Sequence, residues 1–387
     1  MNIGVIDSDL IYNSKHRFPN LVCMKISGYY KNKGHNVKLL MNYEDLNDYD
    51  LIFISKVFTA TQIPDDVLKL PNVKYGGTGF FYDKAEPLPD DIEHCMPDYH
   101  LYDDFVKSRI DGGEKKSNFT YYTDFSIGYT TRGCIRRCSF CVNKNYTVSR
   151  LNSPVREFLD ETRPYICLLD DNIFACKDWK KVFDDLIATG KRVQYKQGVD
   201  ERLLTDEKCE YLFKKSKYAK DKIFAFDNIK DKEIIISKLK MIRRYTDERL
   251  KFYVLCGFDE KGVYGSDFWK QDIINLFERI KILAEYNCLP YVMRFEKYKE
   301  SKYRGIYLNA AAWCNQPNMF KKVPFDVFSK QRGMNRKGTE LYGKDYIAYE
   351  KNSLPKGAAW RYLDEFTADY PEIANTYFNF CGDILPK

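Results

Sequence analysis

Three cysteines stand close together near the middle of the chain. Cys134, Cys138 and Cys141 form a C-x3-C-x2-C pattern, and no fourth thiol occurs at a matching distance. Iron–sulfur clusters are normally ligated by four thiolates, so a cluster held by three keeps one iron open to an exogenous ligand. The pattern therefore predicts an iron–sulfur centre that also binds a second molecule.

Zinc is the alternative metal for a cysteine triplet. Structural zinc sites require four nitrogen or sulfur ligands, often supplied by C-x2-C pairs. No second pair follows at zinc-ribbon spacing, and the histidines all precede the triplet: His16, His35, His94 and His100. The other cysteines stand alone: Cys23, Cys95, Cys167, Cys176, Cys209, Cys256, Cys288, Cys314 and Cys381. In a reducing compartment such cysteines are usually small buried residues.

The triplet resembles the cluster-binding motif of the radical S-adenosylmethionine (SAM) superfamily. The resemblance implies a [4Fe-4S] cluster on Cys134, Cys138 and Cys141, with SAM chelated at the open iron. It further implies cleavage of SAM to a 5'-deoxyadenosyl radical and an electron donor such as flavodoxin or ferredoxin. Phe140 fits too, since the family often has an aromatic residue there beside the adenine.

The composition is that of a soluble globular protein. The 387 residues are 44% hydrophobic and 30% charged, a length suited to two domains plus an appendage. No apolar run is long enough to span a bilayer, and the start lacks a signal-peptide pattern, so we expect a cytoplasmic protein without a membrane partner. The net charge of +7 permits an anionic partner without requiring one.

Residues 1–105 read as an α/β domain. Strand patterns occur at 3–7, 37–40 and 50–55, and a helix pattern at 21–33. This order predicts a mostly parallel sheet and looks like the Rossmann-type cobalamin-binding domain of one radical SAM branch. The D-x-H-x-x-G signature is absent, and His35 lies at a helix end. Bound cobalamin and a scaffold or docking domain are therefore both open.

A polar, turn-rich linker is predicted at 106–124, followed by regular alternation of strands and helices over 125–312. The strand candidates are 125–129, 165–169, 193–195, 223–226, 252–256 and 291–295. The helix candidates are 179–188, 206–216, 231–245 and 269–286. The fold class is thus α/β, with a partial (β/α)6 TIM-type barrel whose chemistry lies at the carboxyl ends of the strands. Residues 313–387 form a C-terminal extension.

Polar residues follow several of these strands. Asp170 and Asp171 end the second strand, where relatives contact the SAM amino group; the alternative is a cap for a helix near Lys177. Asp227 ends the fourth strand and is compatible with SAM or substrate. Gly257 ends the fifth, where the family often has a glycine beneath the adenine.

The third strand is followed by two acids and a base, Asp200, Glu201 and Arg202. An acid here would hold the ribose hydroxyls of SAM, and Arg202 would pair with the SAM carboxylate in two-pronged fashion. The alternative is an ordinary surface ion pair, which is common and weak.

Three residues are candidates for catalysis. Arg294 and Glu296 alternate with Phe295 at the sixth strand, so we expect them to share a face, with one pointing into the barrel mouth. Cys314 lies in a turn-like stretch beside polar and aromatic residues. Its alternative is a packed thiol.

The segment 320–337 is basic and aromatic. Its cations are Lys321, Lys322, Lys330, Arg332, Arg336 and Lys337, and its aromatic residues are Phe320, Phe325 and Phe328. Nucleic acid is a compatible partner, and a solvated lysine face is the alternative. The leading prediction is a radical SAM enzyme with an unidentified substrate, methyl transfer being one compatible outcome. The other class is a zinc-binding or non-catalytic nucleic-acid-associated protein.

Overall fold

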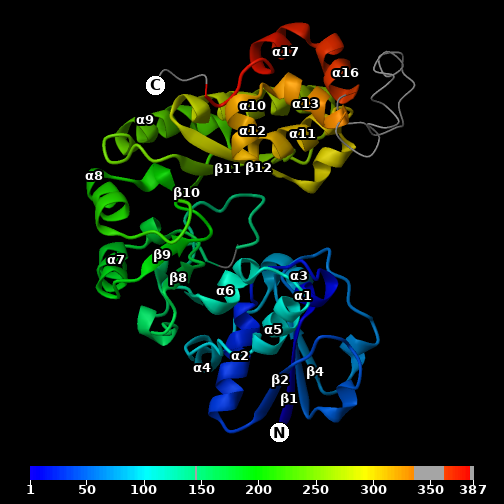
Figure 1. Cartoon of the computed structure of the whole chain (residues 1–387), viewed down its shortest axis with the longest axis vertical. Coiled ribbons are helices and arrows are strands. Elements are labelled where there is room, and N and C mark those ends of the chain that lie inside the picture. Colours follow the sequence, from blue (N-terminus) through cyan, green and yellow to red (C-terminus); the bar gives the residue numbers. More distant parts are fainter. Residues whose placement is uncertain (144–145, 335–360, 384–387) are drawn as a thin grey trace. The chain divides into compact units, whose positions relative to one another are not determined.

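The computed structural model describes residues 1–143, 146–334 and 361–383 (Figure 1). It divides into two compact units, the first made of Met1–Gln197 with Lys215–Lys220 and the second of Gly198–Lys214 with Asp221–Lys387. Among the described residues, no helix has the length and apolar character needed to cross a membrane.

The first unit contains most of the strands. Its elements are β1 (Asn2–Asp7), α1 (Ser8–Tyr12), α2 (Leu21–Asn32), β2 (Asn36–Leu39), β3 (Leu51–Ser55), β4 (Val73–Gly76), α3 (Thr78–Phe81), α4 (Asp90–Glu93), α5 (Asp103–Asp111), α6 (Thr120–Thr123), β5 (Phe125–Gly128), β6 (Thr131–Arg132), β7 (Arg150–Leu151), β8 (Tyr165–Leu168), α7 (Trp179–Ala188) and β9 (Arg192–Tyr195).

The second unit is richer in helix. Its elements are α8 (Asp206–Cys209), β10 (Ile223–Ala225), α9 (Lys232–Ile242), β11 (Leu250–Cys256), α10 (Ser266–Glu285), β12 (Cys288–Arg294), α11 (Arg304–Cys314), α12 (Pro317–Lys322), α13 (Phe325–Met334), α16 (Arg361–Asp369) and α17 (Pro371–Tyr377). The helix predicted at 206–216 is α8 continued by a π-helical turn.

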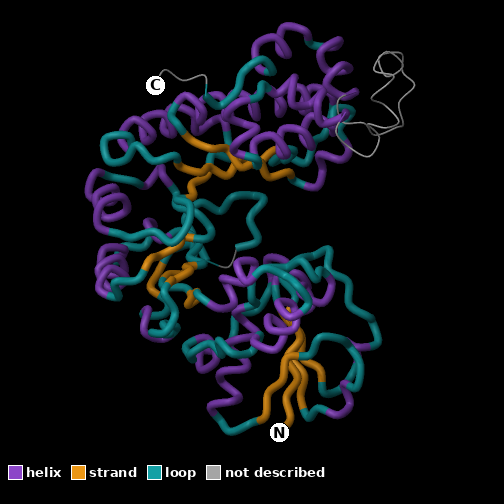
Figure 2. The backbone as a smooth tube through the Cα atoms, in the orientation of Figure 1, coloured by secondary structure: helices purple, strands orange, loops and turns teal. Residues whose placement is uncertain are grey.

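A four-stranded parallel sheet in the order β2-β1-β3-β4 forms the N-terminal part of the first unit (Figure 2). Side chains alternate across it, so Ile3 and Val5 of β1 join one apolar cluster while Ile6 joins the other. Asn20 caps α2 by accepting hydrogen bonds from the amides of Val22 and Cys23.

The predicted linker, 106–124, carries α5 and α6 and adds to this core. Val106, Phe119 and Tyr122 are buried in the same cluster as β1 and α2. Because these apolar side chains leave solvent together with the sheet, the segment contributes to the packing of the first unit.

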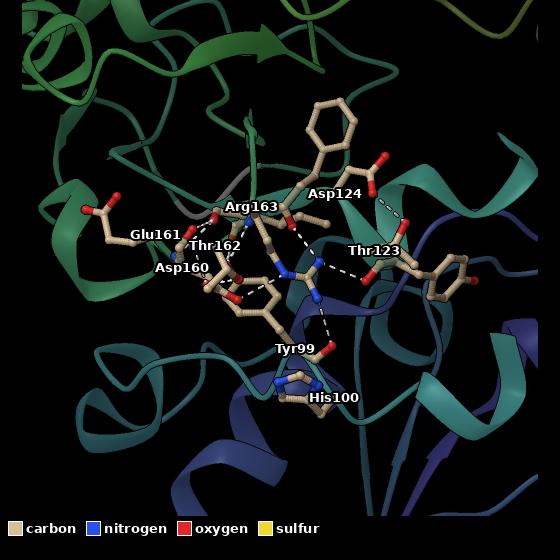
Figure 3. Close-up of polar contacts among 12 residues, drawn as sticks. Tyr99, His100, Thr123, Asp124, Asp160, Glu161, Thr162 and Arg163 are labelled. Carbon is tan, nitrogen blue, oxygen red and sulfur yellow. Dashed lines mark hydrogen bonds and ion pairs between the residues drawn. The ribbon is translucent and has the colours of Figure 1, made fainter. Parts of the chain in front are cut away.

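Arg163 ties this core to the strands that follow (Figure 3). Its buried guanidinium donates to the carbonyl oxygens of Tyr122 at 2.8 Å, Phe125 at 3.1 Å and Tyr99 at 3.0 Å. Its Nε lies 3.2 Å from a carboxylate oxygen of Asp160. An arginine offers five donors in a fixed fork, which suits it to join several backbone segments at one point.

Two further parallel sheets contain the six strands expected for a barrel. β5-β8-β9 lie in the first unit and β10-β11-β12 in the second, each in chain order. The prediction of an α/β protein with parallel sheets is therefore confirmed. The partial barrel itself stays a prediction.

Candidate metal centre

The cysteine loop, defined here as residues 133–149, leaves and returns through a two-stranded antiparallel ribbon. Thr131 of β6 pairs with Leu151 of β7, and Arg132 pairs with Arg150. The ribbon follows β5, the first strand of a parallel sheet. Both ends of the loop are thus fixed at the carboxyl edge of that sheet, where α/β proteins place their ligands.

The three cysteines of the loop are half-buried thiols. The sulfur of Cys134 accepts hydrogen bonds from the amide of Arg136 and the side chain of Asn172, both at 3.4 Å. The sulfur of Cys141 accepts one from the amide of Asn143, also at 3.4 Å. Hydrogen bonds to the ligating sulfurs are one of the means by which a protein tunes an iron–sulfur cluster.

The donor set fits an iron–sulfur cluster by its chemistry. Within the described ranges, no three His, Cys, Asp or Glu side chains gather closely enough to hold a metal ion. The fit therefore rests on three thiols in one loop, on their partial exposure and on the N–H groups that face the sulfurs.

Asp170 anchors the start of the loop. One carboxylate oxygen accepts from the amide of Thr130 at 2.8 Å. The other accepts from the Thr130 hydroxyl at 2.5 Å and from the amide and hydroxyl of Thr131, both at 2.8 Å. Burial raises the pKa of Asp170 to about 6, although these hydrogen bonds oppose the shift. The structure thus gives the predicted SAM ligand four partners on the ribbon.

Asp171 continues this anchor by accepting the Gly133 amide at 2.7 Å. Gly133 has φ of +100°, and a Cβ there would lie 2.2 Å from the carbonyl oxygen of Val148. Only glycine suits that position. The alternative role of Asp170 and Asp171 as a helix cap is wrong, because the cap residue of α7 is Asp178.

Phe140 also lies in this unit, with a half-buried side chain. Its carbonyl oxygen accepts a hydrogen bond from the hydroxyl of Tyr82 at 3.4 Å. Tyr82 follows β4, so a loop at the carboxyl edge of the N-terminal sheet touches the cysteine loop.

This carboxyl edge of the N-terminal sheet is where open parallel sheets bind ligands. In the order β2-β1-β3-β4 the ligand crevice falls between the ends of β1 and β3. Asp9 lies at this edge, and its carboxylate accepts from the amides of Val57 and Phe58 and from the hydroxyl of Thr61. Asp7 is buried beside it, and burial raises its pKa to about 7.

His35 lies far along the chain from this crevice, just before β2 and so at the amino edge of the sheet. Its position agrees with the absence of a histidine signature for cobalamin.

In the second unit, Asp200, Glu201 and Arg202 act mainly on one another and on backbone. Arg202 lies 2.7 Å from both Asp200 and Asp231. Glu201 is 0% exposed, and one of its oxygens accepts from the Ala225 amide at 3.3 Å. Burial raises the pKa of Glu201 to about 8.

Gly257 follows β11 with φ of +75°, and its amide donates to the buried carboxylate of Asp272 at 2.7 Å. Asp227 is half-buried, and it accepts from the Leu255 amide at 2.9 Å. The carboxylates of Asp272 and Asp227 lie close to Arg279, a buried arginine. Its guanidinium donates to the carbonyl oxygen of Asp227 at 2.8 Å.

The three catalytic candidates are dispersed. β12 ends at Arg294, and Glu296 begins a 3-10 turn (Glu296–Glu300). The predicted shared strand face is therefore wrong, because strand alternation stops before Glu296. Both side chains are exposed. Cys314 is the last residue of α11 rather than part of a turn, and it is only 1% exposed, which favours the packed thiol.

The aromatic residues of the basic segment 320–337 do not lie on the surface. Phe320, Phe325 and Phe328 are buried, so the prediction that they interleave with lysines on a surface is wrong. Lys322 and Lys330 are exposed. Arg336 and Lys337 lie outside the described residues, and the side chain of Arg332 is not described.

Lys25 and Glu93 were not predicted as site residues, although Glu93 pairs with both Lys25 and Arg132 at the start of the cysteine loop. A signal was present for Lys25, because it stands between Met24 and Ile26 on an apolar helix. A lysine in such a run is seldom buried without a partner.

Comparison with known proteins finds a similarity to a solved structure. No family model matches this chain, and no curated protein matches it. Among solved structures it is similar to TsrM from Kitasatospora setae, a radical S-adenosylmethionine methyltransferase with cobalamin and a [4Fe-4S] cluster bound. The match covers 76% of this chain and 72% of that chain, with 11% sequence identity and a TM-score of 0.48. The cofactors named are those of TsrM.

Proposed function

We propose that this chain is a radical SAM enzyme that holds a [4Fe-4S] cluster on Cys134, Cys138 and Cys141. The observation that carries the proposal is the C-x3-C-x2-C loop itself, mounted at the carboxyl edge of a parallel sheet with half-buried thiols. Three thiolates leave one coordination position for SAM.

When bound, the cluster and SAM supply one-electron cleavage of a carbon–sulfur bond and the 5'-deoxyadenosyl radical. The chain's own groups hold and orient these cofactors. The N–H groups of Arg136, Asn143 and Asn172 stabilise the thiolates of Cys134 and Cys141. Phe140 lies beside the adenine in this proposal.

The two carboxylates after β8 have a positioning role in this scheme. Asp170 fixes the ribbon and Asp171 fixes Gly133, one residue before the first cysteine. In this proposal Asp170 and Asp171 influence SAM binding only by positioning the cysteine loop. The assignments of Asp200, Glu201, Arg202 and Gly257 to SAM stay predictions that rest on the family resemblance, as does the electron donor.

Hydrogen abstraction from an unidentified substrate is the proposed reaction. Methyl transfer through cobalamin is a compatible finer outcome, which this proposal does not require.

The test is anaerobic reconstitution with iron and sulfide, followed by dithionite and SAM and an assay for 5'-deoxyadenosine. We expect about four irons per chain and 5'-deoxyadenosine in the wild type, as a cubane cluster requires. Cys134→Ala, Cys138→Ala and Cys141→Ala should each lose both. Cys381→Ala is the matched control, since Cys381 is also half-buried but stands outside the loop.

A colourless protein that retains only zinc would overturn the proposal and favour the zinc-binding class. Iron retained by all three loop variants would overturn it as well.

A further inference from the structure

One carboxylate oxygen gathers three donors beside the cysteine loop. Oε1 of Glu93 lies 3.0 Å from Nζ of Lys25, 3.0 Å from the side-chain nitrogen of Asn152 and 3.5 Å from a guanidinium nitrogen of Arg132. Lys25 belongs to α2 and Glu93 to α4. Arg132 belongs to the ribbon and Asn152 directly follows it, so this single oxygen joins the N-terminal sheet region to the base of the loop.

Arg132 and Asn152 stand at opposite ends of the loop. Arg132 ends β6, directly before Gly133, and Asn152 directly follows β7. The backbone N–H of Asn152 also donates a hydrogen bond to the carbonyl oxygen of Thr130 at 2.9 Å. Glu93 therefore holds the exit and the return of the loop together.

Stacking fixes the direction of Arg132. The carbon of its guanidinium lies 3.4 Å from the ring centroid of Tyr129, the residue before the ribbon threonines. A guanidinium held between a carboxylate and an aromatic face has few other rotamers available. Its backbone is then held too, two residues before Cys134.

The carboxylate of Glu93 compensates the positive charges of Lys25 and Arg132. Lys25 has a side chain only 3% exposed, and Glu93 is 12% exposed. Burial lowers the pKa of Lys25, while Glu93 opposes that shift. Without the carboxylate, two cations would remain close together, one of them buried, and such uncompensated charge is strongly destabilising.

We propose that Glu93, held by Lys25, is a positioning residue that sets the geometry of the cysteine loop through Arg132 and Asn152. The proposal rests on the proposed function only in taking this loop as the cluster site. It gives the N-terminal domain a role in the metal centre that needs no cofactor of its own.

The test measures the loop in the full-length, metal-free, reduced protein. Alkylation of each cysteine by iodoacetamide is followed by peptide mass spectrometry. In Glu93→Gln we expect Cys134, Cys138 and Cys141 to react at least about fivefold faster than in wild type, since the loop loses its base contacts. Buried Cys167 should keep its rate.

Glu114→Gln is the matched control, because Glu114 also pairs with two cations of the first unit, Arg17 and Arg109, and does not contact the loop. It should leave all rates unchanged. Arg132→Gln keeps the buried Lys25–Glu93 pair and should reproduce the faster loop reaction, so it decides the question if Glu93→Gln does not fold.

Unchanged loop rates in folded Glu93→Gln and Arg132→Gln would overturn the proposal. An equal rise at Cys167 would also overturn it, by showing a general loss of stability. After reconstitution, the midpoint potential and iron content of the two variants give a second readout. Because alkylation needs no metal, this test is independent of whether the loop binds iron.

Discussion

The β5-β8-β9 sheet and the β10-β11-β12 sheet both end in acidic residues, and these acids have different partners. Asp170, after β8, accepts four hydrogen bonds from the ribbon below the cysteine loop. Asp227, after β10, accepts one from the neighbouring strand. A carboxylate that follows a strand accepts hydrogen bonds from the nearest N–H groups that have no other acceptor. A loop that crosses the edge of the sheet offers more such N–H groups than a neighbouring strand does.

The largest difference should appear between Asp170→Ala and Asp227→Ala. Removing Asp170 leaves two amides and two hydroxyls of the ribbon without an acceptor, which we expect to cost about 3–5 kcal/mol of unfolding free energy. Removing Asp227 leaves the Leu255 amide unpaired and should cost about 1–3 kcal/mol. Urea denaturation of both variants measures the difference, and equal losses would contradict the distinction between the two sheets.

The glycines give a second comparison of the same kind. Gly133→Ala combines a φ of +100° with a Cβ 2.2 Å from backbone, and we expect a loss of about 2–3 kcal/mol. Gly257→Ala has φ of +75° and meets the Cβ of Tyr298 at 3.0 Å, so about 1–2 kcal/mol is expected.

Thermal unfolding of the two glycine variants, with iron content after reconstitution, tests this comparison. Iron should fall in Gly133→Ala alone. A normal iron content there would show that the loop tolerates a shifted start.

The buried carboxyl group of Glu201 should make the stability of the chain depend on pH. Burial raises its pKa from 4.5 to about 8, so between these values the folded chain binds more protons than the unfolded chain. Stability therefore falls as the pH rises through this window, by up to about 1.4 kcal/mol per pH unit. Between pH 6 and pH 7.5 the wild type should lose about 2 kcal/mol of unfolding free energy through this group, and Glu201→Gln should not lose it.

Exposed Glu210 provides the control, and Glu210→Gln should keep the wild-type slope. Urea denaturation at the two pH values is the measurement. An unchanged slope in Glu201→Gln would place the proton uptake on other groups.

The sequence predicted the parts of this molecule that depend on local pattern. The strands and the helix 179–188 follow hydrophobic periodicity, and the cysteine spacing is visible without any fold. The partners of Asp170 and Glu93 were not predictable, because they lie 39 to 68 residues away along the chain and meet only through packing. The exposure of Phe320 was misjudged for the same reason, since burial depends on which helices cover a residue, whereas the packed thiol considered for Cys314 agrees with its burial.

Cys314→Ala should have the smallest effect and separates the two kinds of cysteine. Cys314 is buried in α11, so replacing its sulfur removes packing worth about 1 kcal/mol and leaves 5'-deoxyadenosine formation unchanged. Cys141→Ala should show the reverse, with little change in thermal unfolding of the metal-free chain and complete loss of iron, because its thiol is half-buried in a loop. Lost activity in Cys314→Ala at unchanged stability would instead make that thiol a reacting group, and the second unit would then contribute chemistry that its packing does not indicate.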